Sequence, residues 1–157
     1  MRISTRDLLV ALAIIVALVA VFAVHKRPTK SAIRASAILT PGALNPDVTQ
    51  ENIHSTICVS GWTATIRPPP DYTDALKVKQ MREYGETGPP SAYEEDHLIS
   101  LELGGAPRDP RNLWPEPRPR ADEVDRTEND LNAKVCSGKL SLADAQRQES
   151  ELKHRDG

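Results

Sequence analysis

Residues Tyr93 to Pro117 read YEEDHLISLELGGAPRDPRNLWPEP, and this stretch decides the fold. Asp96 and His97 are neighbours, so their side chains point to opposite faces of an extended strand. That arrangement lets one group bind a metal ion while the other holds or deprotonates a water molecule beside it. The leucine-rich run after His97 supplies apolar positions that would bury a strand, and its Gly-Gly pair predicts a turn. We therefore expect a hairpin in which Asn112-Leu113-Trp114 returns as the second strand after a long loop.

This stretch resembles the HNH, or ββα-metal, nucleases. The resemblance rests on the run DHLISLELGG, followed after a short loop by RNLWPEP. More narrowly, it is similar to a group of small exported HNH-like bacterial proteins that share D-H-x-I-x-L-E-L-G-G and N-L-W-P-E-P. The similarity continues into the cysteines and the C-terminal helical segment, and so covers residues 45 to 150. It implies an α+β fold with a ββα-metal core and flanking helices.

The resemblance also implies roles for three residues. His97 would be the general base that activates water, and Asp96 would be a metal ligand. Asn112, at the matching Asn position, would hold the His97 region in place through backbone or imidazole hydrogen bonds. A hard divalent cation such as Mg²⁺ suits carboxylate and amide ligands better than Zn²⁺, and Mn²⁺ is a further alternative. The implied activity is metal-dependent, non-specific hydrolysis of phosphodiester bonds in nucleic acid, with DNA favoured over RNA.

The helix expected after the motif departs from the family's pattern. HNH nucleases typically place a His or Asn ligand there, whereas this chain has neither until Asn129. Asp122 or Asp125 could complete the site as a carboxylate ligand, and spacing alone does not choose between them. Glu128, one helical turn further on, is a weaker candidate. A fold of this kind with an incomplete site would serve as a binding module.

Four arginines surround the motif's loop and the proline-rich segment after it: Arg108, Arg111, Arg118 and Arg120. Such a group can neutralise phosphates, although solvated loop arginines are an equally good interpretation. The formal net charge of -2 gives the chain no global basic character. Binding of nucleic acid would therefore need a local cationic face.

The N-terminus contains an uninterrupted apolar segment, Leu8 to Val24, with Arg2 and Arg6 before it and His25-Lys26-Arg27 after it. At about 1.5 Å per residue, a helix of this length approaches the thickness of a bilayer core. We expect an uncleaved membrane anchor, with a cleaved signal peptide and a buried core helix as alternatives. The domain would then lie outside the cytoplasm, anchored in the periplasm or extracellular space, or secreted if the segment is cleaved.

These patterns divide the chain into three regions. Residues 1–25 would form the anchor or signal segment, residues 26–44 a basic, Ser- and Ala-rich linker, and residues 45–157 the HNH-like domain. A chain of 157 residues with 39% hydrophobic content supports one modest domain. Its 13 prolines predict a loop-rich fold with a small core.

Local patterns predict the flanking elements. Residues 48–57 are typical of a helix with Asp47 as N-cap, and residues 58–66 of a strand because they are rich in β-branched and aromatic side chains. Residues 74–84 predict a helix that Thr73 caps and Gly85 ends. Further on we expect a proline-rich elbow at 115–119, a helix at 121–135, and a last helix at 142–153 capped by Ser141.

The chain has two cysteines, Cys58 and Cys136, whose separation excludes a CxxC redox or zinc motif. In an exported chain they predict a disulfide bond. For a loop of this length, the chain-entropy relation gives a stabilisation of at most about 4.5 kcal/mol. Two buried free thiols would be expected instead if the domain faced the cytoplasm.

Three classes of function remain compatible with the sequence. An HNH-like endonuclease held at or outside the membrane is the leading hypothesis. The second is a catalytically weak module of the same fold that binds nucleic acid or protein. The third is a membrane-tethered structural protein of the envelope, in which the acidic cluster binds a cation.

Overall fold

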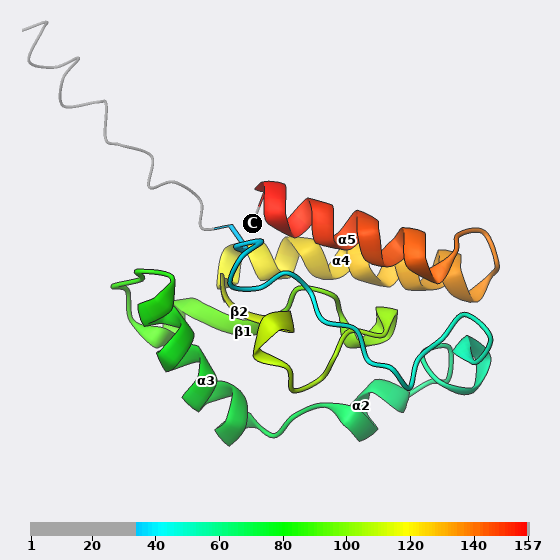
Figure 1. The fold of residues 1–157 in the computed structure, drawn as a ribbon, viewed down its shortest axis with the longest axis horizontal. Helices are drawn as coiled ribbons and strands as arrows, with labels where there is room; N and C mark the ends of the chain where they lie inside the picture. The colour runs from blue at the N-terminus through cyan, green and yellow to red at the C-terminus, as the bar shows by residue number, and fades with distance from the viewer. Residues whose placement is uncertain (1–33, 157) are drawn as a thin grey trace, which may run out of the picture. The chain divides into compact units, whose positions relative to one another are not determined.

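A two-stranded hairpin with helices on both faces organises the structure, a computed structural model that describes residues 34–156 (Figure 1). The strands are β1 (Tyr93–His97) and β2 (Leu113–Pro117), which pair antiparallel. The helices are α2 (Trp62–Ile66), α3 (Pro70–Glu83), α4 (Arg118–Cys136) and α5 (Leu142–Asp156). Short 3₁₀ turns lie at Ile53–Ser55, Pro90–Ala92, Leu101–Leu103 and Pro110–Asn112. The fold is α+β, as the sequence predicts.

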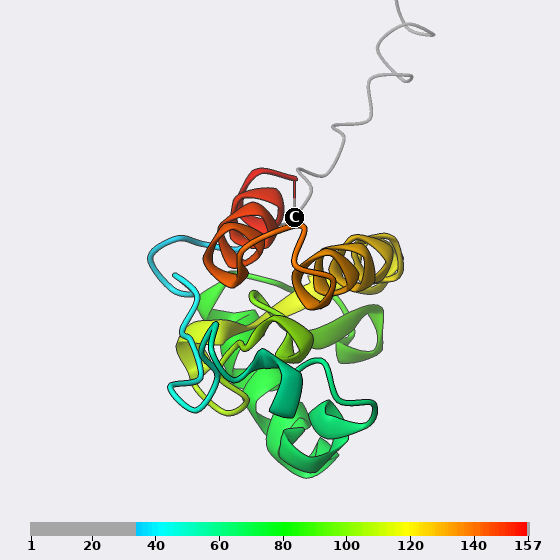
Figure 2. The same ribbon diagram turned by 90° about the vertical axis from the view of Figure 1, so that its right-hand side faces the viewer.

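The helices divide between the two faces of the hairpin. Helix α3 contacts one face of both strands, whereas α4 and α5 lie side by side over the other (Figures 1 and 2). Adjacent residues of β1 therefore meet different neighbours. His97 lines a pocket with residues of α3, while Asp96 reaches Lys153 of α5.

The first strand is shorter than the sequence predicts, because β1 ends at His97. Leu101–Leu103 forms a 3₁₀ turn instead of continuing the strand, although Leu101 and Leu103 are both buried. Two backbone amides that follow β1 form hydrogen bonds with side chains instead of with another strand. The Ile99 amide donates to Asn112 Oδ1, and the Ser100 amide donates to the carboxyl group of Glu149.

Helix α3 confirms the predicted stop but not the predicted start. It ends at Glu83, two residues before Gly85. Its first residue is Pro70, so Thr73 is not its N-cap and lies in the first turn. Proline at the first helical position has its φ angle preset and lacks only an amide hydrogen that would be unpaired there anyway.

The predictions for residues 48–66 are wrong. The first part forms turns, because Asn52 accepts from the Thr49 amide and donates to the Asp47 carbonyl, which competes with helical bonding. The predicted strand at 58–66 contains turns and the short helix α2 instead. Gly61 precedes α2 at a positive φ of 79°, a conformation that ends any extended run.

The segment after the motif is more regular than expected. Instead of an elbow at 115–119, β2 runs through Pro117 and α4 begins at Arg118. Prolines are tolerated because each strand of this hairpin has an edge without a partner strand. The two predicted C-terminal helices are confirmed, with longer bounds. Ser141 Oγ accepts from the Asp144 amide at 3.1 Å, which confirms the predicted N-cap of α5.

The folded unit begins earlier than the predicted boundary between residues 44 and 45. Ala35 is buried, and its amide donates to the Lys153 carbonyl at 3.3 Å. Thr40 is fully buried, and its hydroxyl donates to the Leu113 carbonyl at 3.2 Å. Residues 34–44 are therefore part of the domain rather than of a linker, because Ala35 and Thr40 are buried and bonded to α5 and the hairpin.

The predicted membrane segment, Leu8 to Val24, lies outside the described residues. Within residues 34–156, no helix combines the length and apolar character that crossing a bilayer requires.

The core lies mainly between the 48–57 segment, the Leu101–Leu103 turn and helices α4 and α5. Its buried members are Val48, Ile53, Ile57, Ile99, Leu103, Leu131, Val135, Leu142 and Ala145. A disulfide bond between Cys58 and Cys136 closes this end of the molecule, with a Cα–Cα distance of 5.6 Å. The predicted disulfide is therefore present, and it joins the segment before α2 to the last residue of α4.

Candidate functional site

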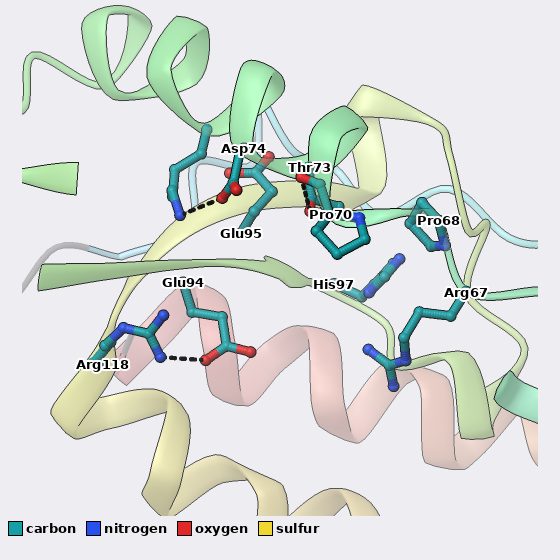
Figure 3. A pocket seen from close by; sticks show the side chains of 10 residues that line it. Arg67, Pro68, Pro70, Thr73, Asp74, Glu94, Glu95, His97 and Arg118 are labelled. Carbon is teal, nitrogen blue, oxygen red and sulfur yellow. Dashed lines mark hydrogen bonds and ion pairs between the residues drawn. The ribbon is translucent and has the colours of Figure 1, made fainter. Parts of the chain in front are cut away.

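An open pocket of about 210 Å³ lies beside β1 and is lined by residues of that strand, of α3 and of the segment before α3, and by Arg118 of α4 (Figure 3). His97 and Arg67 lie together at one end of the pocket, while Arg118 and Glu94 form an ion pair at the other. The lining residues are Arg67, Pro68, Pro70, Thr73, Asp74, Lys77, Glu94, Glu95, His97 and Arg118. The pocket thus combines a histidine, several carboxyl groups and three cationic side chains.

His97 is oriented as a base. Its Nε2 lies 3.1 Å from the Pro107 carbonyl oxygen. A carbonyl only accepts hydrogen bonds, so Nε2 carries the proton and Nδ1 of the neutral ring keeps its lone pair. Burial lowers the pKa of His97 below its usual range. The neutral imidazole therefore predominates at neutral pH and is able to take a proton from water.

Asn112 binds the chain just after His97 to the loop that returns to β2. Its side chain is fully buried and accepts from the Ile99 amide at 3.0 Å. It donates to the carbonyls of Ile99 and Ala106 at 2.9 and 3.1 Å. The loop closes so tightly that a Cβ on Gly105 would lie 1.7 Å from the Ile99 oxygen. Asn112 thus holds the end of β1 through backbone bonds, one of the two ways that the resemblance implies.

Asp96 lies on the other side of β1 and contacts a lysine. Lys153 Nζ, from α5, donates to Asp96 Oδ2 at 2.6 Å, to the His97 carbonyl at 2.5 Å and to Glu128 Oε1 at 2.7 Å. The side chain of Lys153 is fully buried. Because an ammonium group has three protons, these three acceptors satisfy it completely.

Four carboxyl groups surround this single ammonium. Burial opposes ionisation of Asp96, but the Lys153 charge together with hydrogen bonds from Glu116 and Lys153 outweighs it and lowers the pKa of Asp96. Burial raises the pKa of Glu128 and Glu149, and raises that of Glu116 to about 9 with help from the Asp96 charge. The carboxylates in turn raise the pKa of Lys153 despite its burial. The cluster therefore contains an ion pair of Lys153 with Asp96, among carboxyl groups whose pKa values burial raises.

The predicted metal ligands Asp96 and Asp125, whose side chains the structure describes, are not brought together in a metal site. Asp125 is exposed on α4, and Asp122 lies on the same helix, with its side chain outside the described part. No group of three His, Cys, Asp or Glu side chains within the described residues is arranged to hold a metal ion. Oxygens of Asp96 and Glu128 do converge, but on the Lys153 ammonium. A divalent ion such as Mg²⁺ needs oxygens at about 2.0–2.1 Å, so the residues as arranged do not fit one there.

The predicted phosphate-binding arginines separate into two groups. Arg118 lines the pocket and is bonded to Glu94. The other three make contacts elsewhere: Arg108 over the Tyr72 ring, Arg111 with Asp109 at 2.6 Å, and Arg120 with Glu123 at 3.0 Å. Only Arg118 of the four is therefore a lining residue of the pocket that holds His97.

Sequence reasoning missed several members of the site. Arg67 lies close enough to His97 for its charge to contribute to lowering the pKa of the imidazole. Glu95 has both carboxyl oxygens buried without a hydrogen-bond partner, and burial raises its pKa to about 8 although the Lys77 charge opposes this. Arg67 carried no specific signal. Glu95 and His97 share the same strand face at a spacing of two residues, a signal that was present in the sequence.

Lys153 was also missed, for a different reason. It is 57 positions from Asp96, and its spacing of four from Glu149 is an ordinary helical pairing that predicts a solvated face. No local pattern distinguishes such a lysine from an exposed one.

Comparison with models of known protein families, with curated proteins and with solved structures found no match in any of the three.

Proposed function

We propose that this protein is an HNH-like phosphodiester hydrolase that cleaves nucleic acid, with DNA favoured over RNA and without base specificity. The observation that carries the proposal is the His97 imidazole, held by the Pro107 carbonyl so that Nδ1 is the basic nitrogen, in a pocket that also contains Arg67 and Arg118. The order of β1, β2 and α4, with Asn112 bonding the end of β1, supports a ββα-metal type of core.

The proposed chemistry follows from this geometry. Nδ1 of His97 takes a proton from water while the water oxygen bonds to phosphorus, and the bond from phosphorus to the leaving oxygen breaks. The leaving oxygen recovers a proton from solvent. Arg67 and Arg118 stand at the two ends of the pocket and would offset the charge of the phosphodiester.

The resemblance to HNH nucleases implies a divalent metal ion, with Mg²⁺ favoured over Mn²⁺ or Zn²⁺. Such an ion would supply positive charge at the phosphoryl oxygens. Asp96, Asp122 and Asp125 are the ligands that the resemblance implies, but Asp96 is bonded to Lys153 and as arranged does not fit such an ion. The hydrolysis described above uses only groups of the chain itself. The proposed site of action is outside the cytoplasm, with the N-terminal segment as the membrane anchor or export signal.

Plasmid DNA and a structured RNA, incubated with the purified full chain, test the proposal. Parallel reactions contain Mg²⁺, Mn²⁺ or EDTA, so that metal dependence is measured rather than assumed. We expect nicking by the wild-type protein and a rate lower by roughly 10²–10⁴-fold in His97→Ala, the usual contribution of a general base. His54→Ala, at an exposed histidine, is the matched control and should cleave normally. The proposal fails if no condition gives cleavage or if His97→Ala cleaves at the wild-type rate.

A second candidate is a module of this fold that binds nucleic acid without cutting it. The observation that favours it is the Lys153 ammonium at the point where Asp96 and Glu128 converge, because it displaces the expected metal. Retention of DNA by the full chain without cleavage in any of these reactions would support this second function. Absence of both binding and cleavage would leave a membrane-tethered structural role.

A further inference from the structure

The position between Asp96 and Glu128 has the geometry of a cation site. Asp96 Oδ2 and the His97 carbonyl come from β1, and Glu128 Oε1 comes from α4. All three oxygens lie 2.5–2.7 Å from one point, Lys153 Nζ. Convergence of carboxylate and carbonyl oxygens from separate elements is typical of positions that bind hard cations.

The lysine reaches this position from the inner face of α5. Its side chain is fully buried, whereas the side chains of Asp96 and Glu128 are 22% and 13% exposed to solvent. The carboxylate pair can therefore be reached from solvent, while the ammonium is enclosed from behind by the helix. A hydrated ion approaching from outside would meet two carboxylates whose shared position is already filled.

Helix α5 is held firmly enough to keep the ammonium in place. The Glu149 carboxyl group accepts from the Ser100 amide at 3.0 Å with both oxygens, and Gln146 donates to the Leu103 carbonyl at 2.9 Å. The Ala35 amide donates to the carbonyl of Lys153 itself. Withdrawing the ammonium would therefore break contacts along the length of α5 and not only those of one side chain.

We propose that Lys153 is the resident cation of the Asp96–Glu128 pair, so that this position binds no divalent metal ion. The lysine would fix the end of β1 and neutralise the Asp96 side chain, as a metal ion would. Unlike a metal ion, it is a covalent part of the chain. This inference goes beyond the proposed hydrolysis and does not depend on it. It applies equally to an active enzyme and to a binding module.

Binding of Mn²⁺ to the full chain, measured by electron paramagnetic resonance and by thermal unfolding, tests the inference without relying on activity. The wild-type protein and Asp96→Asn should bind the same amount of Mn²⁺, because Asp96 holds no ion in the wild type. Lys153→Met, which removes the ammonium group and keeps most of the apolar length of the side chain, should gain one Mn²⁺ site. Saturating Mn²⁺ should then raise the Tm of that variant by roughly 5 °C.

Two controls make the assignment specific. Lys139→Met changes an exposed lysine and should gain no site. The double variant Asp96→Asn with Lys153→Met should lose the Mn²⁺ site that the single variant gained. Both results together would locate the new ion at the position of the ammonium.

The outcomes that overturn the inference are equally definite. Removing the partner of buried carboxylates is strongly destabilising, so Lys153→Met can fail to fold. The comparison of wild type with Asp96→Asn then decides alone. A Mn²⁺ site that is present in the wild type and lost in Asp96→Asn refutes the inference. Equal Mn²⁺ binding by the two proteins supports it. A folded Lys153→Met protein that binds no Mn²⁺ also refutes it, since the position would then be no cation site.

Discussion

At the residue scale, neighbouring side chains of β1 have separate roles because the strand is covered differently on its two faces. His97 faces a pocket and is neutral, whereas Asp96 is ionised and paired with a buried ammonium. Strand geometry alone predicts that the two point apart. Their partners could not be predicted, since Lys153 and Arg67 are brought to β1 only by the packing of α5 and of the segment before α3.

Asn112→Ala should lower the free energy of unfolding by roughly 2–4 kcal/mol, because it leaves the buried Ile99 amide and the Ile99 and Ala106 carbonyls without their partner. Urea unfolding would measure the change. Asn129→Ala is the matched control, since its exposed side chain donates only to the Asp125 carbonyl, and it should cost far less. Equal losses in the two variants would contradict the positioning role of Asn112.

Glu95 should make stability fall as the pH rises. Burial raises its pKa from 4.5 to about 8 in the folded protein, so between these values the folded state keeps a proton that the unfolded chain has lost. The contribution is fully present below pH 4.5 and is lost as the pH approaches 8, by at most about 1.4 kcal/mol per pH unit. Urea unfolding of wild type and Glu95→Gln from pH 4 to 8 would show a flatter slope in the variant. Parallel slopes would show that Glu95 is ionised in the folded protein.

At the element scale, the motif predicted the hairpin and local patterns predicted α4 and α5, although the bounds of these elements differ from the predicted ones. These elements carry local signals of their own, such as Ser141 before α5 and the alternating side-chain direction along β1. Residues 48–66 could not be predicted in the same way, because a side chain of Asn52 and a positive φ at Gly61 override the local propensities. The candidate site was predictable where it depends on the hairpin alone, and not where it depends on α3 or α5.

The disulfide should stabilise the fold at this scale by joining the segment before α2 to the end of α4. Its cysteines are 78 residues apart, and a loop of that length predicts at most about 4.5 kcal/mol from chain entropy. A Cys58→Ser, Cys136→Ser double variant should therefore unfold at a lower temperature than the oxidised wild type. Dithiothreitol should lower the Tm of the wild type and leave that of the variant unchanged. A wild-type Tm that dithiothreitol does not change would mean that the bond contributes nothing to stability.

At the scale of the whole molecule, a formal charge of -2 restricts nucleic-acid binding to local contacts. The pocket offers Arg67 and Arg118 for such contacts, and two neutralised phosphates predict a slope of about -2 for log K against log salt on duplex DNA. Arg67→Ala should reduce the slope to about -1 in a fluorescence-anisotropy titration. Arg111→Ala, whose guanidinium is paired with Asp109 away from the pocket, should leave it unchanged. Salt-independent binding would exclude this cationic contact.

The bond between the Ala35 amide and the Lys153 carbonyl has a topological consequence. It places the first and last parts of the described chain beside each other, and His154 Nε2 lies 2.9 Å from the Thr40 carbonyl at the same place (Figure 1). A short linker from residue 156 to residue 34 would therefore close this part of the chain into a ring. Such a ring could be reopened at the exposed turn between α4 and α5, which makes the domain a natural scaffold for circular permutation.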